Sequence, residues 1–246
     1  MEILRRQIEK QVHSLTGASL GVLDLDQPRG DAGLFGPESM VWKVHADFTA
    51  MMVGGISALL LQMLHPLALA GVWDHSTFRQ DMLGRLRRTS LFVAGTSYGG
   101  RHDAEQLIDK VRRIHLQVVG QAPDGRAYAA TDPGLLTWVH VSEVSQFLAG
   151  YLRYVDPELP VAEQDRYYRE VALIAERLGA QGVPKSSQAT GDYLERMRPQ
   201  LLCDERTREV VRLLYTAPMP NILAKPFGSL MTVSYTHLTL PTILLV

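Results

Sequence analysis

The sequence of 246 residues contains a single cysteine, Cys203. One thiol cannot form a disulfide within the chain, and it cannot supply the several thiolates that structural zinc sites and iron–sulfur clusters need. Cysteine-poor chains are typical of reducing compartments. The amino-terminal residues mix charges and lack the apolar centre of a secretory signal, so we expect a cytoplasmic protein that begins at Met1.

An excess of charge of either sign is also missing, because 25 lysines and arginines balance 26 aspartates and glutamates. Proteins that bind nucleic acid through its phosphates usually carry a strong positive field, so we expect no nucleic-acid partner. Hydrophobic residues make up 46% of the chain, which excludes a disordered protein. A chain of this length and composition is expected to form one domain around one core.

The longest stretch without Asp, Glu, Lys or Arg covers residues 48–73. It is long enough to cross a bilayer. Glycines, a glutamine and the pair His65–Pro66 interrupt it, however, and acidic residues rather than basic ones flank it. We therefore expect buried core helices and no stable membrane span, with peripheral membrane association left open.

Strand-type alternation is absent from the first 230 residues, so the sequence predicts an all-α fold. Ser39 is expected to cap one helix, Asp103 and Gln106 to form a capping box, and Asp132 with Pro133 to start the longest helix. The motif GTSYGG reads as a turn that follows a short basic helix. Helices are predicted over residues 2–15, 39–64, 66–73, 85–88, 103–120, 133–154, 161–179, 188–200 and 204–216.

The last residues, SYTHLTLPTILLV (234–246), are uncharged, rich in Thr and Leu, and unrelated to the helical pattern before them. Translated adapter sequence at the end of a reading frame has this character. We expect residues 1–233 to be a truncated domain that lacks its carboxy-terminal helices, and 234–246 to be a non-native tail. His237 in this tail carries no functional argument.

Four histidines lie in or beside apolar segments: His65, His75, His115 and His140. A lone histidine on an apolar face is more often a hydrogen-bonded core residue than a metal ligand. Several together favour a metal site, and haem iron requires one axial nitrogen inside a dry helical pocket. His115, in VRRIHLQVVG, lies in the apolar stripe of the predicted helix 103–120 and is our candidate ligand.

Other metal centres have weaker support in the sequence. The paired Glu-x-x-His motifs of di-iron proteins and the His-Glu-x-x-His motif of zinc hydrolases are absent. His140 and Glu143 come nearest, in reversed order, and an internal hydrogen bond explains them equally well. A non-haem metal enzyme using His115, His140 and Glu143 as a facial cluster is one alternative. A helical lipid- or membrane-associated protein that is not an enzyme is the other.

A basic stretch, GRLRRT (84–89), is most simply a solvated helix face. The spacing of its residues also supports a second interpretation, as a ligand-binding face. Arg85 and Thr89 are four residues apart, so on a helix they share one face. Together they present a guanidinium and a hydroxyl, a combination suited to haem propionates or to bound oxygen.

The motifs LLLQMLHPLALAGVWDHSTFR, GRLRRTSLFV, VRRIHLQVVG and GRAYAATDPGLLTWVHVSEVSQFL follow one another in this order. Over roughly residues 35–220, this order resembles the rubber oxygenase and MpaB-type oxygenase family, which includes latex-clearing proteins. The resemblance implies an all-helical catalytic domain with a buried b-type haem and one axial histidine, which matches His115. It also matches Arg85 and Thr89 to the family's Arg and Thr.

His140 and His65 fall in blocks typical of this family, and we assign neither to the iron. Arg88 stands where rubber-cleaving members carry lysine. Because arginine does not lose its proton, lysine-based chemistry is not available there, and rubber is not the expected substrate.

The resemblance therefore implies a haem b-dependent oxygenase that oxidises or cleaves a small apolar, unsaturated, prenyl-like substrate with dioxygen. His115 is the expected axial ligand of the iron. Arg85, Arg88 and Thr89 are the expected catalytic residues, and Arg85 and Thr89 are also expected to contact the cofactor.

Overall fold

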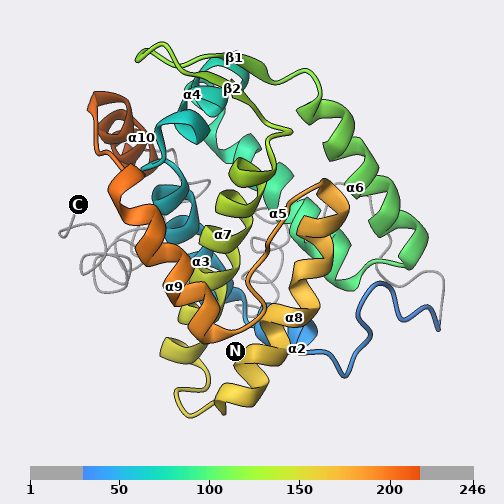
Figure 1. The fold of residues 1–246 in the computed structure, drawn as a ribbon. Helices are drawn as coiled ribbons and strands as arrows, with labels where there is room; N and C mark the ends of the chain where they lie inside the picture. The colour runs from blue at the N-terminus through green and yellow to red at the C-terminus, as the bar shows by residue number, and fades with distance from the viewer. Residues whose placement is uncertain (1–29, 217–246) are drawn as a thin grey trace.

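The structure, a computed structural model, describes residues 30–216. The predicted helix 2–15 and the predicted tail 234–246 lie outside the described residues. Within them, the chain forms one mainly helical domain with a small two-stranded sheet, which confirms the all-α prediction (Figure 1). The elements are α2 (Met40–His45), α3 (Phe48–Gln62), α4 (Pro66–His75), α5 (Met82–Tyr98), α6 (Arg101–His115), β1 (Val119–Gln121), β2 (Ala127–Ala129), α7 (Pro133–Tyr154), α8 (Val161–Leu178), α9 (Ser187–Met197), the 3-10 turn η2 (Arg198–Gln200) and α10 (Glu205–Thr216).

The long helix α7 runs through the middle of the domain beside α3 (Figure 1). It has its predicted bounds, with Pro133 in the first turn and the Asp132 side chain accepting a hydrogen bond from the Leu135 amide. Two glycines let α3 and α7 approach closely. A Cβ added to Gly54 would lie 2.6 Å from the Gln146 carbonyl oxygen, and one added to Gly150 would lie 2.6 Å from that of Ala50.

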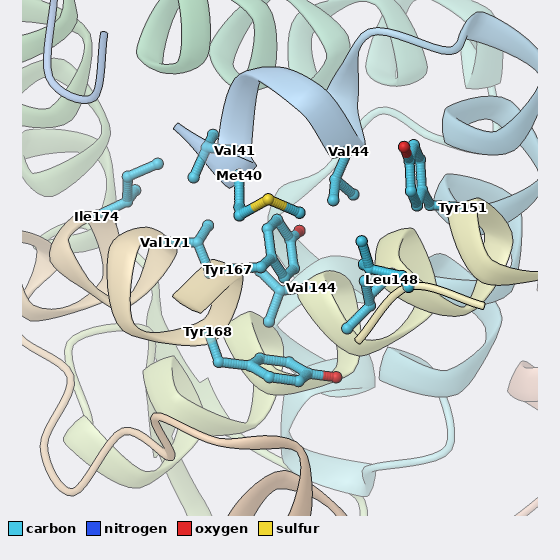
Figure 2. Close-up of a cluster of buried hydrophobic side chains, with 11 residues drawn as sticks. Met40, Val41, Val44, Val144, Leu148, Tyr151, Tyr167, Tyr168, Val171 and Ile174 are labelled. Carbon is cyan, nitrogen blue, oxygen red and sulfur yellow. The ribbon is translucent and has the colours of Figure 1, made fainter. Parts of the chain in front are cut away.

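The core is formed by several apolar clusters around α7. In the largest, Tyr167 of α8 lies beneath Met40 of α2, with Val144 of α7 beside it (Figure 2). A second cluster joins α3, α4, α5 and α10 around Phe78, which is fully buried. The second cluster holds the start of α5 through Met82 and Leu86, and the first contacts its middle through Phe92.

The segment without charged residues forms two helices, α3 and α4, rather than a single one. Their axes meet at an angle of 103° at His65–Pro66. Among residues 30–216 no single helix is long and apolar enough to cross a membrane, and only this bent pair reaches that length and composition together. Many of the α3 side chains are buried in the core, as predicted.

The predicted helix 39–64 was wrong in one respect, because the chain breaks it at Ala46 and Asp47. Ser39 caps α2 as expected, with its hydroxyl accepting from the Trp42 amide. The Asp47 carboxylate then accepts from the Ala50 amide and caps a new helix, α3. A capping side chain accepts a hydrogen bond from an amide that has no other partner in the first turn of a helix. Asp47 therefore favours the start of a new helix at this point.

Helix α5 is longer than predicted, and the interpretation of GTSYGG as a turn was wrong. Asp81 caps the helix by accepting from the Gly84 amide. The helix then continues through Tyr98, because Gly95, Thr96 and Ser97 are buried against the rest of the fold. Only Gly99 and Gly100 form the turn that leads into α6.

Two predictions for the next segment were also wrong. Helix α6 begins at Arg101 after Gly100, with no side-chain cap, so Asp103 and Gln106 form no capping box. It ends at His115 rather than Gly120, because residues 119–121 pair with 127–129 in an antiparallel hairpin. This hairpin is anchored on α4 by Tyr128, whose hydroxyl donates to Asp74 at 2.6 Å. Such a tertiary contact holds strands that are too short to show alternation.

Candidate functional site

The candidate ligand and its candidate partner lie on one helical hairpin formed by α5 and α6. A connection of two residues makes the helices antiparallel neighbours. Arg85 is fourteen residues before Gly99 and His115 is fifteen residues after Gly100. Both residues therefore lie at the end of the hairpin remote from its turn.

His115 ends α6 with its ring half-buried. Its Nδ1 atom is buried and has no hydrogen-bond partner among residues 30–216. Burial lowers the pKa of the ring, which favours the neutral imidazole that metals bind. A buried ring nitrogen without a partner is costly, so the position suits a ligand that uses it.

Arg85 is the second site residue with a buried nitrogen, and its side chain is a cation. Its Nη1 atom is buried and has no partner among the described residues. Burial, and secondarily the charge of Arg88, lower the pKa of this guanidinium to about 10, so it stays charged at neutral pH. A buried cation without a carboxylate is unfavourable. The site therefore suits an anionic group. The Nε of Arg87, two residues further along the helix, is likewise buried without a partner in the described part of the chain.

Arg88 and Thr89 are on the same helix but are exposed. Arg88 forms an ion pair with Asp81, with 3.5 Å between Nη1 and Oδ2. The helix does bring Thr89 onto the face of Arg85, as the spacing predicted. Among the expected site residues, only Arg85 and His115 carry buried polar atoms that lack partners.

The structure contradicts the facial cluster of His115, His140 and Glu143. Within residues 30–216, no three His, Cys, Asp or Glu side chains are placed to hold a metal ion. His140 and Glu143 project from α7 toward the part of α5 nearest its turn, whereas His115 ends α6 at the other end of the hairpin. The length of the hairpin separates them.

His140 and Glu143 instead line a cavity of about 20 Å³ between α2, α5, α7 and α8. Burial lowers the pKa of His140 to about 4 and raises that of Glu143 to about 7. A space of this size holds about one water molecule. The macrocycle of a haem does not fit there, so this cavity is not the haem pocket expected from the resemblance.

Sequence reasoning missed a third titratable residue of this cavity, His45 at the end of α2. Its Nδ1 lies 2.8 Å from Ser97 Oγ and its Nε2 lies 2.9 Å from Tyr167 Oη. Burial lowers the pKa of His45 to about 3, so its ring is neutral. The available signal was helical spacing, because Val41 and Val44 place His45 on the apolar side of α2.

The other two histidines in apolar segments have structural contacts. His65 caps α4 by accepting from the Ala68 amide, and its ring lies 5.8 Å from that of Trp138. His75 Nε2 lies 3.1 Å from the Val119 carbonyl oxygen. These contacts agree with leaving His65 unassigned to the iron.

Comparison with known proteins adds one finding. Residues 42–243 match the family described as ER-bound oxygenase mpaB/B' and rubber oxygenase, catalytic domain. No curated protein and no solved structure matches the chain significantly. The family match covers His115, Arg85 and Thr89 and extends over most of the sequence. The chain therefore belongs to the mpaB and rubber oxygenase family of oxygenases, matching its catalytic domain.

Proposed function

We propose that the protein is a haem b-dependent oxygenase that uses dioxygen to oxidise or cleave a small apolar, unsaturated substrate. The observation that carries this proposal is the pair of buried nitrogens, on His115 and Arg85, that have no partner among residues 30–216 and lie at the same end of one helical hairpin. A neutral imidazole and a guanidinium are the donors that a haem iron and a haem propionate need. Membership of an oxygenase family supports the same chemistry.

In this proposal each residue has a definite task. His115 would hold the iron, and Arg85 would bind a propionate through a charge-assisted hydrogen bond. The bound haem would supply the dioxygen chemistry, while the protein supplies placement and polarity. Thr89 and Arg88 would supply a hydroxyl and a guanidinium beside the bound group.

Apolar side chains beside His115 suit an apolar substrate. Ile114 is 52% exposed, Leu116 63% and Val119 56%. The three residues lie within six positions of one another in the chain, and exposed apolar side chains near a site are typical of binding surfaces. We propose that this surface meets the prenyl-like chain before it reaches the iron.

Replacing His115 tests the function directly. We expect purified protein reconstituted with haem to show an intense Soret band, and His115→Ala to lose or shift it, because the nitrogen that would hold the iron is removed. His102→Ala is the matched control, since His102 is an exposed histidine of the same helix. It should keep the parent spectrum. A parent protein without a Soret band, or an unchanged spectrum in His115→Ala, would contradict the proposal.

Replacing Arg85 tests the propionate contact. Arg85→Gln should weaken haem binding by about 10- to 100-fold, the value of a charge-assisted hydrogen bond. The same change should raise the melting temperature of the haem-free protein, because it removes a buried charge that has no partner in the described part of the chain. Arg101→Gln removes an exposed charge at the other end of the hairpin and should change neither quantity. Equal haem titrations of Arg85→Gln and parent would argue against this contact.

A further inference from the structure

The junction between α6 and β1 groups exposed apolar side chains on one surface. Nine large apolar side chains are exposed among residues 30–216, and three of them lie within six positions at this junction: Ile114, Leu116 and Val119. Single exposed apolar side chains are normal on a protein surface and need no explanation. A group of three is different, because apolar side chains that gather on a surface are typical of a contact with a partner.

The fold holds this group in an ordered turn at the edge of the domain. The Gln117 amide donates to the Ile114 carbonyl at 3.0 Å, and α6 ends there. The Val118 side chain packs inward against the cluster that contains Tyr128, whereas all three residues of β1 are exposed. The chain from α6 to β1 runs along the upper edge of the domain (Figure 1). The core therefore takes up Val118 and leaves its apolar neighbours outside.

Positive charge accompanies the apolar group. Residues 110–122 contain no Asp or Glu and three cations, which are Lys110, Arg112 and Arg113. The preceding part of α6, residues 101–109, has the opposite balance, with three acids and one arginine. Arg112 pairs at 3.7 Å with an aspartate one turn earlier, while Lys110 and Arg113 form no ion pair within residues 30–216. A chain with balanced charge thus carries a local excess of cations at this end of α6.

The start of α5 adds to this excess, because it lies at the same end of the helical hairpin. Residues 81–88 and 109–113 together contain six lysines and arginines and only two aspartates. The two aspartates, Asp81 and Asp109, each pair with an arginine of the same group. This end of the hairpin therefore presents apolar side chains beside uncompensated positive charge.

An anionic lipid surface accommodates both features at once. Apolar side chains enter the boundary between headgroups and acyl chains, and lysines and arginines bind the headgroups. A second copy of the chain fits less well, because a symmetric contact would place the same cations against one another. Nucleic acid would meet the cations but would leave the apolar side chains in water.

We propose that the α6–β1 surface, defined as residues 110–121, docks the protein on an anionic lipid bilayer. Ile114, Leu116 and Val119 enter the interface, and Lys110 and Arg113 contact the headgroups. Docking itself requires no haem. As an extension that rests on the proposed function, docking places His115 next to the phase in which an apolar prenyl-like substrate dissolves.

Sedimentation of the full-length purified protein with lipid vesicles tests the docking. We expect the protein to sediment with vesicles of equal parts phosphatidylserine and phosphatidylcholine, and to stay in solution with vesicles of phosphatidylcholine alone. High salt should release it, because salt screens the charges. No binding to either vesicle, or binding that does not need phosphatidylserine, would overturn the proposal.

Two double variants with the same change of charge separate this surface from net charge. Lys110→Gln with Arg113→Gln should weaken vesicle binding by about 30-fold, since each cation near an anionic surface contributes a factor of about five. Arg153→Gln with Arg169→Gln removes two exposed charges of α7 and α8 and should leave binding unchanged. Equal weakening by the two pairs would show a general attraction by charge and would overturn the assignment of the surface.

The apolar group has its own matched pair. Leu116→Gln with Val119→Thr should weaken binding by about 10-fold, because less apolar area leaves water. Val161→Thr with Leu202→Gln changes a valine and a leucine of nearly the same exposure elsewhere and should bind like the parent. All four side chains lie outside the core, so melting temperatures should stay equal. Parent-like binding of the first pair would overturn the insertion of apolar side chains.

Hydrogen exchange locates the contact and identifies its occupant. The amides of residues 114–121 should exchange more slowly on the vesicles, and those of residues 153–161 should keep their rates. Protection of residues 114–121 that rises with protein concentration in the absence of vesicles would assign the surface to a second copy of the chain and would overturn the proposal.

These measurements involve neither haem nor turnover, so the docking and the proposed function fail separately. Vesicle binding in a protein without a Soret band would keep the docking surface and refute the oxygenase proposal. A Soret band that depends on His115, in a protein that does not bind vesicles, would do the reverse.

Discussion

Gly54→Ala is expected to destabilise the protein by about 2 kcal/mol or more, although alanine is the better helix former. The added Cβ would lie 2.6 Å from the Gln146 carbonyl oxygen and 3.0 Å from the Phe147 Cα. Both are backbone atoms of α7, so no side chain can rotate away. The two helices must separate, and they pack against each other along the middle of the core.

The adjacent glycine provides a matched control with the opposite sign. A Cβ on Gly55 meets only the Cε1 of Phe147, at an ordinary 3.7 Å. Gly55→Ala should therefore stabilise the protein by about 0.5–1 kcal/mol through helix propensity. Urea unfolding followed by circular dichroism measures both changes. Equal effects of the two substitutions would show that helix propensity, not the close approach of α3 and α7, decides the outcome.

Local sequence signals predicted the elements whose ends are fixed by their own residues. Helix α7 starts at Asp132–Pro133 with the predicted cap, and α8 ends at Gly179, which has a left-handed backbone with φ of 108°. A cap or a left-handed glycine acts within one turn, so its signal is present in a short window. Helix α8 also carries an apolar stripe, and α7 is apolar and buried along most of its length.

Elements fixed by distant contacts were predicted poorly. Helix α5 has no strong apolar stripe, and Gly95 within it resembles the start of a turn. It remains helical because Thr96 and Ser97 are buried by other helices, a contact that a local pattern does not contain. The same reason applies to β1 and β2, which depend on the contact between Tyr128 and Asp74.

In the candidate site, too, only the features that depend on local sequence signals were predicted. Arg85 and Thr89 share a face because of their spacing, and the resemblance to a known family selected His115. His45 was missed because its partners, Ser97 and Tyr167, are 52 and 122 residues away in the chain. Apolar periodicity predicts that a side chain is buried, but it does not predict which polar groups it meets. A buried polar network is therefore visible only in three dimensions.

The network around His45 should make the fold sensitive to acid. In the unfolded chain this histidine titrates at its ordinary value of 6.5, whereas burial lowers the folded pKa to about 3. Between these values the unfolded state binds a proton that the folded state does not, so stability falls as the pH decreases. The contribution is fully present above pH 6.5 and is lost progressively toward pH 3. From pH 7 to pH 4, it amounts to about 3 kcal/mol.

His45→Gln isolates this contribution, because glutamine can still hydrogen-bond and does not titrate. We expect the variant to be less stable than the parent at pH 7 but to lose about 3 kcal/mol less on acidification to pH 4. His140 acts in the same direction, and Glu143 in the opposite one, since its raised pKa favours the fold as the pH falls. Both remain in the variant, so they cancel in the comparison. Urea unfolding at the two pH values measures the difference, with the exposed His102→Gln as control. Parallel pH dependence of His45→Gln and parent would mean that the ring takes up its proton at the same pH in the folded and unfolded states, and the neutral chain from Ser97 to Tyr167 would then be wrong.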